Sequence, residues 1–153
     1  MNKKILTLCI IHQHPKILLG MKKRGHGVGK WNGFGGKVEQ GETIEEAAKR
    51  EIKEEAGIET KKINKLGILE FIYQDGSGNM EVHIFCAKEF EGNPIESEEM
   101  KPKWFDVDEI PFDQMWSDDK YWLPMFLDGK SFRGKFLFDE FNEIIDYSLL
   151  EVK

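Results

Sequence analysis

Three glutamates stand close together near the end of an expected helix: Glu51, Glu54 and Glu55. At 3.6 residues per turn they fall within about 100° of arc, and Glu51 and Glu55 are in phase with apolar residues that should face the core. Burying carboxylates without a partner is costly, so a cation is expected beside them. Because no His or Cys is clustered with these oxygen donors, a hard cation, Mg²⁺ or Mn²⁺, is favoured over zinc.

The same charges allow a second interpretation, a solvated acidic helix face. Glu45 with Lys49 and Arg50 with Glu54 have the i,i+4 spacing of helical ion pairs. That interpretation explains the charges but not the glutamates in phase with the apolar stripe. Arg50 is expected to orient or neutralise one carboxylate as the partner of a metal ligand.

Local signals define the helix that carries these acids. Thr43 followed three residues later by Glu46 is a capping box, and Gly57 is a typical helix stop, so the pattern predicts a helix over residues 43–56. The preceding segment, residues 24–36, has six glycines in thirteen positions. This composition predicts a loop that bends sharply or approaches a ligand closely.

The remaining elements are predicted to be strands, one short helix and a loop. Two hairpins are expected because turn residues separate pairs of β-like runs. The expected strands are 3–13, 16–22, 66–73, 80–90, 103–107, 132–138 and 144–152, with a turn at 74–78, a loop at 91–102 and a helix at 118–127. Hairpins mixed irregularly with helices predict an α+β fold with mixed strand directions.

Length and charge limit the class of protein. The chain has 153 residues, which predicts a single domain over residues 1–153. Its 22 Lys and Arg against 28 Asp and Glu give a net charge of -6. This balance speaks against a protein that binds polymeric nucleic acid or an anionic membrane, but not against one that binds a small anionic ligand.

The chain shows no pattern for export or membrane insertion. The early apolar run, residues 5–11, is too short for a membrane span, and no signal-peptide pattern follows it. Cys9 and Cys86 each lie in an apolar segment, so buried free thiols in a reducing compartment are expected. We therefore expect a cytoplasmic protein, with a mitochondrial or nuclear fraction also compatible.

A basic segment precedes the acidic helix. Residues 22–38 contain five bases and no acid, which suits phosphate binding, although a solvated basic loop would have the same composition. A P-loop is not supported, because the glycine spacing is one residue short and Trp31 stands where Ser or Thr is required. The four histidines make no zinc-binding pattern with the cysteines.

The spacing of the acidic residues resembles that of a known family. Gly36, five residues, Glu42, seven residues, and then residues 50–58 (REIKEEAGI) match every fixed position of the Nudix box, G-x5-E-x7-R-E-U-x-E-E-x-G-U, where U is a bulky aliphatic residue. Nine constrained positions in 23 residues make this resemblance specific. It implies an α/β/α sandwich with a mixed central sheet, a loop-helix-loop metal site, and hydrolysis of a nucleoside diphosphate linked to a further group.

The resemblance extends to the branch of the family that acts on oxidised purine nucleoside triphosphates such as 8-oxo-dGTP and 2-hydroxy-dATP. It is carried by residues 31–38 (WNGFGGKV), 96–100 (ESEEM), 110–112, 115–116, 118–119, 121–122, 146–147 and 151–152. It implies hydrolysis to monophosphate and diphosphate, which keeps damaged nucleotides out of DNA. The implied partner is a small nucleotide, with no polymeric nucleic acid and no membrane, and we expect a monomer.

The resemblance also assigns roles to residues. The implied metal ligands are Gly35, Glu51, Glu54, Glu55 and Glu99, and the catalytic group consists of Arg50 with the same four glutamates. The implied substrate-binding residues are Thr7, Lys22, Asn32, Phe34, Gly35, Gly36, Lys37, Phe71, Met80, Trp116, Ser117, Asp118 and Asp119. Which carboxylate takes the proton from water stays open.

Two acidic neighbours are expected at the base end of the site. If Asp118 and Asp119 share a proton in a closed apolar pocket, the pair can address both oxidised guanine and oxidised adenine. The alternative is that Ser117, Asp118 and Asp119 cap the following helix. His26 stands where a member of this branch of the family has Phe, and Ser117 stands where it has Pro, so the preference among damaged bases stays open.

Two other functions remain compatible with the sequence. One is a Nudix hydrolase of a different nucleoside diphosphate derivative, such as ADP-ribose, a dinucleoside polyphosphate or capped RNA. The other is a non-catalytic nucleotide-binding module, although the intact Glu51, Glu54 and Glu55 argue against it.

Overall fold

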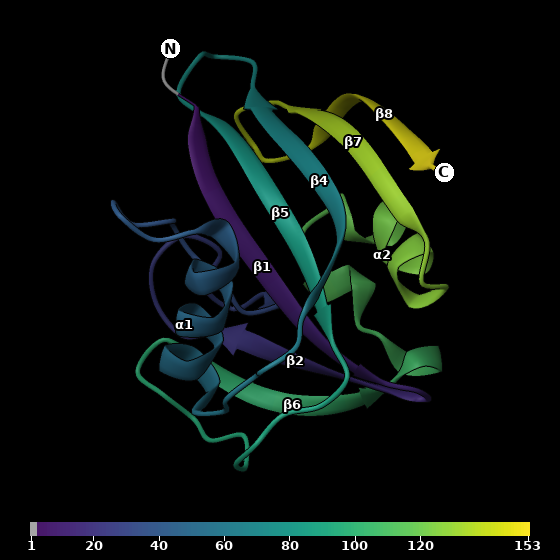
Figure 1. The fold of residues 1–153 in the computed structure, drawn as a ribbon. Helices are drawn as coiled ribbons and strands as arrows, with labels where there is room; N and C mark the ends of the chain where they lie inside the picture. Colours follow the sequence, from purple (N-terminus) through teal and green to yellow (C-terminus); the bar gives the residue numbers. More distant parts are fainter. Residues whose placement is uncertain (1–2) are drawn as a thin grey trace.

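Eight strands form one mixed sheet in the order β3-β2-β1-β5-β4-β7-β8, with β6 paired to β2 outside this sequence (Figure 1). The structure, a computed structural model, describes residues 3–153. The elements are β1 (Lys4–Gln13), β2 (Lys16–Lys22), β3 (Trp31–Asn32), α1 (Ile44–Ala56), β4 (Asn64–Tyr73), β5 (Asn79–Ala87), β6 (Met100–Asp106), the 3₁₀ turns η1 (Val107–Glu109) and η2 (Phe112–Gln114), α2 (Asp119–Leu127), β7 (Ser131–Phe138) and β8 (Ile144–Val152).

Strand directions in the sheet are mixed, as predicted. β1 pairs parallel to β5, and β4 pairs parallel to β7, whereas the β1–β2, β4–β5 and β7–β8 pairs are antiparallel. Both expected hairpins, β1–β2 and β4–β5, are present. The parallel pairs join strands that are far apart in the sequence, and they bring β1 and β7 to opposite flanks of the β4–β5 hairpin.

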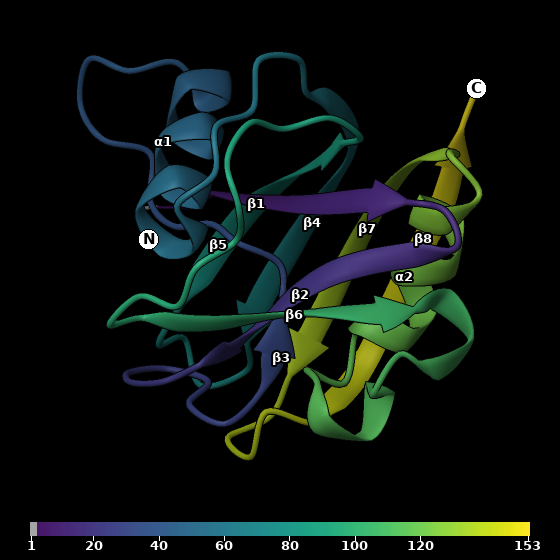
Figure 2. The same ribbon diagram turned by 90° about the horizontal axis from the view of Figure 1, so that it is seen from below.

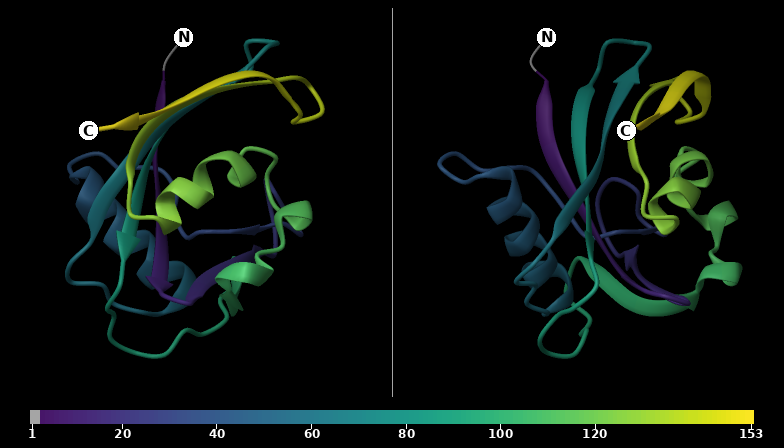
Figure 3. Two further views of the ribbon diagram at one scale, coloured as in Figure 1. Left: turned by 90° about the vertical axis from the view of Figure 1, so that its right-hand side faces the viewer. Right: turned by 45° about the vertical axis from the view of Figure 1, so that its right-hand side comes forward.

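The two helices cover opposite faces of the sheet (Figure 3). Successive residues of a strand point to opposite faces, so Cys9 and Ile11 pack under α1 while Ile10 faces the α2 side. The α1-side core also contains Ile52 of α1, and the α2-side core contains Trp122 of α2. This arrangement confirms the α/β/α sandwich.

The two cysteines are buried and free, as predicted. Cys9 belongs to the α1-side core and Cys86 to the α2-side core. Because the two thiols lie on opposite faces of neighbouring strands, the sheet itself separates them.

Helix α1 has the predicted boundaries. The Thr43 side chain accepts a hydrogen bond from the Glu46 N–H, and the Glu46 carboxylate accepts one from the Thr43 N–H, which completes the capping box. Gly57 ends the helix at φ 73°, in the left-handed region that glycine adopts readily. The buried face includes Glu55, but Glu54 is exposed, so only part of the acidic group follows the apolar stripe.

Several predicted boundaries were wrong. The glycine-rich segment 24–36 contains the short strand β3, the strand predicted at 80–90 ends at Ala87, and the loop predicted at 91–102 ends where β6 begins. β6 runs along the whole of β2 (Figure 2), and Pro102 of β6 pairs with Gly20 of β2. Pro102 lacks an N–H donor but is tolerated, because among residues 3–153 the strand β6 pairs only with β2 and so lies at an edge of the sheet.

The turns between β6 and α2 were not predicted. Two 3₁₀ turns, η1 and η2, fill this segment and lead the chain to Trp116 at the mouth of the cavity described below. Among residues 3–153, no helix is both long enough and apolar enough to cross a membrane.

Candidate active site

A cavity of about 190 Å³ opens on the α2 side of the sheet, between the strands and the loop after β2. Its apolar wall comes from the β4–β5 hairpin, through Phe71, Tyr73, Met80 and Val82, and from Phe138 of β7. These side chains share one face because residues two apart on a strand point the same way. The wall gives a flat, apolar ligand an enclosed place to bind.

Trp116 stands at the mouth of this cavity. Its ring lies 4.9 Å from the ring of His26, centroid to centroid, at an interplanar angle of 32°. The ammonium of Lys30 lies 5.3 Å from the centre of the same indole. The loop that carries His26 and Lys30 turns through Gly25, Gly27 and Gly29, all at positive φ, and therefore folds tightly over one flank of the indole.

Two buried acids lie deeper in the cavity. Asp118 is 4% and Asp119 is 3% exposed. The Trp122 indole N–H donates to Asp118 Oδ2 at 2.8 Å, whereas Asp119 Oδ2 has no hydrogen-bond partner among the described residues. Burial raises the pKa of both carboxyls, and the neighbouring Asp118 charge raises the pKa of Asp119 further. Burial and the neighbouring carboxylate thus favour the protonated form of Asp119, which can donate a hydrogen bond.

The alternative that these residues cap α2 was wrong. Asp118 occupies the N-cap position, but its side chain makes no capping hydrogen bond. The Ser117 hydroxyl instead donates to the Asn142 carbonyl, at 3.2 Å, in the turn between β7 and β8.

The opposite end of the cavity is bounded by the glycine-rich segment 33–36 and by Lys22. This segment runs beside β1, where the Cys9 and Phe34 backbones exchange two hydrogen bonds and the Thr7 N–H donates to the Gly36 carbonyl at 2.9 Å. A Cβ on Gly35 would overlap the Thr7 carbonyl. Glycine is required here because no side chain fits between this segment and β1.

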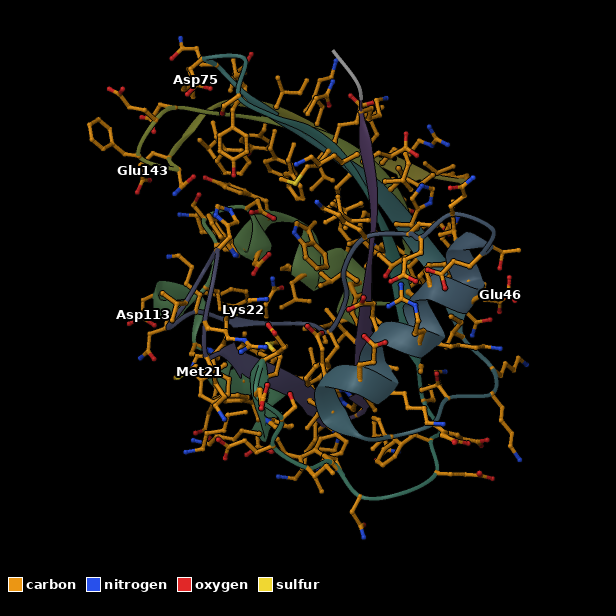
Figure 4. The ribbon with its side chains drawn as sticks, turned by 90° about the vertical axis from the view of Figure 1, so that its left-hand side faces the viewer. Met21, Lys22, Glu46, Asp75, Asp113 and Glu143 are labelled. Atoms are coloured by element: carbon orange, nitrogen blue, oxygen red, sulfur yellow. The ribbon has the colours of Figure 1, made fainter. Side chains whose placement is uncertain are left out.

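Lys22, the last residue of β2, lines the cavity at the same end as the glycine-rich segment. In Figure 4 it lies between Asp113 on one side and helix α1, marked by Glu46, on the other. An ammonium at this place suits the phosphates of a ligand whose base occupies the apolar end.

Glu55 is the α1 carboxylate that reaches the cavity. It is 5% exposed, and its Oε1 accepts a hydrogen bond from the Gly35 N–H at 2.9 Å. Burial raises the pKa of Glu55 to about 7, and the nearby charges of Glu51 and Glu99 act in the same direction while Lys22 opposes them. The carboxyl is thus held in a place where a cation would stabilise its ionised form.

Arg50 organises the neighbouring acids. Its guanidinium donates to Glu42 at 2.7 and 3.0 Å, to Glu51 at 2.6 Å and to the Lys37 carbonyl at 3.0 Å, and it lies 3.4 Å from Glu54. The hydrogen bond from Arg50 is the main reason that the pKa of Glu42 falls to about 2. The expected role of Arg50 as a partner of the carboxylates agrees with these contacts.

The carboxylates do not converge on one point as they stand. No three His, Cys, Asp or Glu side chains within residues 3–153 are gathered into a ready metal site. Arg50 engages Glu51, and Arg24 engages Glu99 at 2.6 and 2.8 Å. The donor set nevertheless fits a hard cation, since Glu51 packs against Gly36, where an added Cβ would lie 2.6 Å from its carboxylate, and Glu55 is buried beside it.

Most of the predicted substrate-binding residues meet in the cavity. Its lining includes Thr7, Lys22, Asn32, Gly35, Gly36, Phe71, Met80, Trp116, Asp118 and Asp119, together with Glu55. Three predicted residues lie elsewhere. Phe34 is fully buried in the core under α1, Lys37 is exposed with its carbonyl bound to Arg50, and Ser117 turns toward Asn142.

Sequence reasoning missed part of the apolar wall. Tyr73 and Val82 continue the inward phase of Phe71 and Met80, so strand alternation was a signal for them. Phe138 gave no such signal, because it reaches the wall only through the parallel pairing of β4 with β7.

The whole arrangement follows a known domain. The sequence matches the NUDIX domain over residues 3–126. The chain belongs to the Nudix family. In this Nudix protein, the Nudix box links the glycine-rich segment to α1. The contacts given above that do so involve Gly36, Glu42 and Arg50.

Two relatives cover nearly the whole Nudix chain. A protein of Danio rerio named oxidized purine nucleoside triphosphate hydrolase is 51% identical over 152 residues, which are 99% of this chain and 97% of the relative. The Mus musculus protein of the same name is 50% identical over 151 residues, with the same coverage. A solved structure of the mutator MutT protein from Bacillus halodurans is 33% identical, has a TM-score of 0.86, and matches 95% of this chain and 97% of its own.

Proposed function

We propose that this Nudix protein hydrolyses oxidised purine nucleoside triphosphates, such as 8-oxo-dGTP and 2-hydroxy-dATP, to the monophosphate and diphosphate. The observation that carries the proposal is one cavity with two chemically different ends. Trp116 and the two buried acids stand at one end, and Lys22, the glycine-rich segment and Glu55 stand at the other. The two relatives named above support the choice of substrate.

The base end suits an oxidised purine. A purine stacked on Trp116 would gain about 1 to 3 kcal/mol, by analogy with bases stacked on aromatic side chains. Asp119, protonated, donates a hydrogen bond, and Asp118, already bound to Trp122, accepts one. Oxidation at C8 of guanine or C2 of adenine adds polar atoms to the purine edge, which such a mixed donor and acceptor pair can read.

The phosphate end suits hydrolysis of the anhydride between the α- and β-phosphates. Lys22 and the backbone of residues 33–36 orient the triphosphate. Water attacks the α-phosphorus and gives its proton to one of the site carboxylates, while the bridging oxygen leaves with the diphosphate. Glu51, Glu54, Glu55, Glu99 and the Gly35 carbonyl would hold Mg²⁺ or Mn²⁺. Such a cation would neutralise phosphate charge and would lower the pKa of a bound water.

All of these groups come from one chain. The cavity, the acidic helix and the loop of Glu99 lie on or beside a single sheet. We infer that a monomer consisting of one domain suffices for the reaction, with a free nucleotide as the partner.

A substrate panel tests the proposal. The purified protein is assayed with 8-oxo-dGTP, 2-hydroxy-dATP, dGTP, dATP, ADP-ribose and a dinucleoside polyphosphate, each with Mg²⁺ and with Mn²⁺, and the products are identified by chromatography. We expect the oxidised triphosphates to give the highest kcat/KM and to release diphosphate. A higher kcat/KM for ADP-ribose, or release of single phosphate, would refute the proposal.

A further inference from the structure

Two charged loops face each other beside the phosphate end of the cavity. One follows β2 and contains Lys23 and Arg24, and the other precedes β6 and contains Glu96 and Glu99. The Lys23 ammonium lies 2.6 Å from the Glu96 carboxylate, and the Lys23 N–H donates to the Glu99 carbonyl at 2.8 Å. These contacts fix the two loops against each other even though they are about 75 positions apart in the sequence.

Within this contact, Arg24 holds the side chain of Glu99. Its Nε and Nη2 donate to one carboxylate oxygen, Oε1, at 2.8 and 2.6 Å, while Lys22 lies 3.6 Å from the other oxygen. Glu98 also lies 3.5 Å from Arg24. The side chains of Arg24 and Glu99 are 60% and 38% exposed, so a dissolved cation can compete for this carboxylate.

The backbone places Glu99 close to the acids of α1. The Ser97 hydroxyl donates to the Glu55 carbonyl at 2.8 Å and accepts from the Glu99 N–H at 3.3 Å. The Ile95 N–H donates to the Ala56 carbonyl at 2.9 Å. The backbone of Glu99 is therefore held at the end of α1, while its carboxylate accepts hydrogen bonds from the Arg24 guanidinium.

We propose that Arg24 is a positioning residue that competes with the metal ion for Glu99 until a triphosphate draws the guanidinium away. The inference rests on the proposed function, because it assigns Glu99 to the metal set. A guanidinium binds phosphate as well as carboxylate with paired hydrogen bonds, so an arriving triphosphate offers Arg24 a new partner. Glu99 is then released to the cation, which makes metal binding and triphosphate binding mutually supportive.

Metal affinity without nucleotide tests the first half of this exchange. Binding of Mn²⁺ to the nucleotide-free protein is measured by electron paramagnetic resonance for the wild type, R24A, R24K, E99Q and the double variant R24A/E99Q. We expect R24A to bind Mn²⁺ about two- to fivefold more tightly, the range expected when an exposed ion pair is removed. R24K should fall between R24A and the wild type, and E99Q should bind more weakly.

The double variant separates competition at Glu99 from a general charge effect. If Arg24 acts through Glu99, the gain of R24A disappears in the E99Q background. K130A is the matched control, because it removes one exposed positive charge that pairs with Glu151, outside both loops. It should leave Mn²⁺ affinity within the error of the wild type.

Triphosphate binding tests the second half. In the hydrolysis assay, R24A should raise KM for the triphosphate several-fold, and kcat should fall by a smaller factor. R24K should restore most of the lost affinity for the triphosphate. Unchanged or weaker Mn²⁺ binding by both R24A and R24K, or a gain that persists without Glu99, would overturn the inference. Absence of hydrolysis by the wild type would instead refute the proposed function, and the Mn²⁺ measurement does not depend on it.

Discussion

Trp122 donates its indole N–H to Asp118, and this bond distinguishes the two buried acids of the cavity. Asp118 has a partner at 2.8 Å, one helical turn further along α2, whereas Oδ2 of Asp119 has none among the described residues. Adjacent carboxyls in the same buried environment therefore have different roles. Asp118 is the better acceptor, and Asp119 is the acid that retains the proton.

The first prediction concerns substrate choice at Asp119. The Asp119→Asn amide always has donors and cannot ionise, so the dependence of base preference on pH should be lost. We expect the ratio of kcat/KM for 8-oxo-dGTP to that for 2-hydroxy-dATP to differ from the wild-type ratio and to stay flat between pH 6 and 9. A ratio identical to the wild type at every pH would contradict a proton shared between the two acids.

The second prediction concerns stability against pH. Burial raises the pKa of Asp119 above its value in the unfolded chain, so the folded state binds the proton more tightly. The resulting stability is fully present below the unfolded pKa, about 4, and is lost as pH rises. Asp119→Asn removes this dependence, so its Tm relative to the wild type should increase between pH 4 and pH 7.5. Gln114→Ala, at an exposed residue that does not ionise, is the control and should show a constant difference.

The third prediction concerns Glu55. Glu55→Gln keeps an acceptor for the Gly35 N–H but removes the buried charge beside the phosphate end. We expect turnover to fall by more than about 100-fold, since even partners of metal ligands are commonly worth 10- to 100-fold. Mn²⁺ binding, measured separately, should weaken as well. Glu45→Gln, on the exposed first turn of the same helix, should retain activity. Full turnover by Glu55→Gln would refute the metal-site assignment.

The fourth prediction concerns stacking on Trp116. Removing the indole with Trp116→Ala should raise KM for 8-oxo-dGTP by about 5- to 150-fold, which corresponds to the 1 to 3 kcal/mol of a base–aromatic contact. Trp116→Phe should recover most of the loss, and kcat should change little. Phe141→Ala, at a ring that is 74% exposed in the β7–β8 turn, is the matched aromatic control. A fall in kcat with unchanged KM would show that Trp116 does not bind the base.

The local part of this structure was predictable from the sequence. The capping box at Thr43, the stop at Gly57 and the hairpin turns each depend on residues a few positions apart, and each was confirmed. The fixed spacing of the Nudix box likewise led to the arrangement of Gly36, Glu42 and Arg50.

The remaining features depend on contacts between distant segments. Phe138 enters the cavity wall because β7 pairs with β4, and Arg24 meets Glu99 because two loops 75 positions apart face each other. The side chain of Phe34 was misplaced for a different reason. Glycines on both sides of it hide the alternation that shows which face of a strand a residue occupies, and its two hydrogen bonds with Cys9 direct it under α1.

The backbone bonds between β1 and the glycine-rich segment also determine how this part of the molecule moves. Cys9 with Phe34, and Thr7 with Gly36, tie residues 33–36 to a central strand. The amide hydrogen of Phe34 should therefore exchange with solvent as slowly as the amide hydrogens of the sheet, although the amides of glycine-rich loops usually exchange fast. If residues 33–36 orient the triphosphate as proposed, this backbone is already ordered before the nucleotide arrives, so little conformational entropy is lost there on binding.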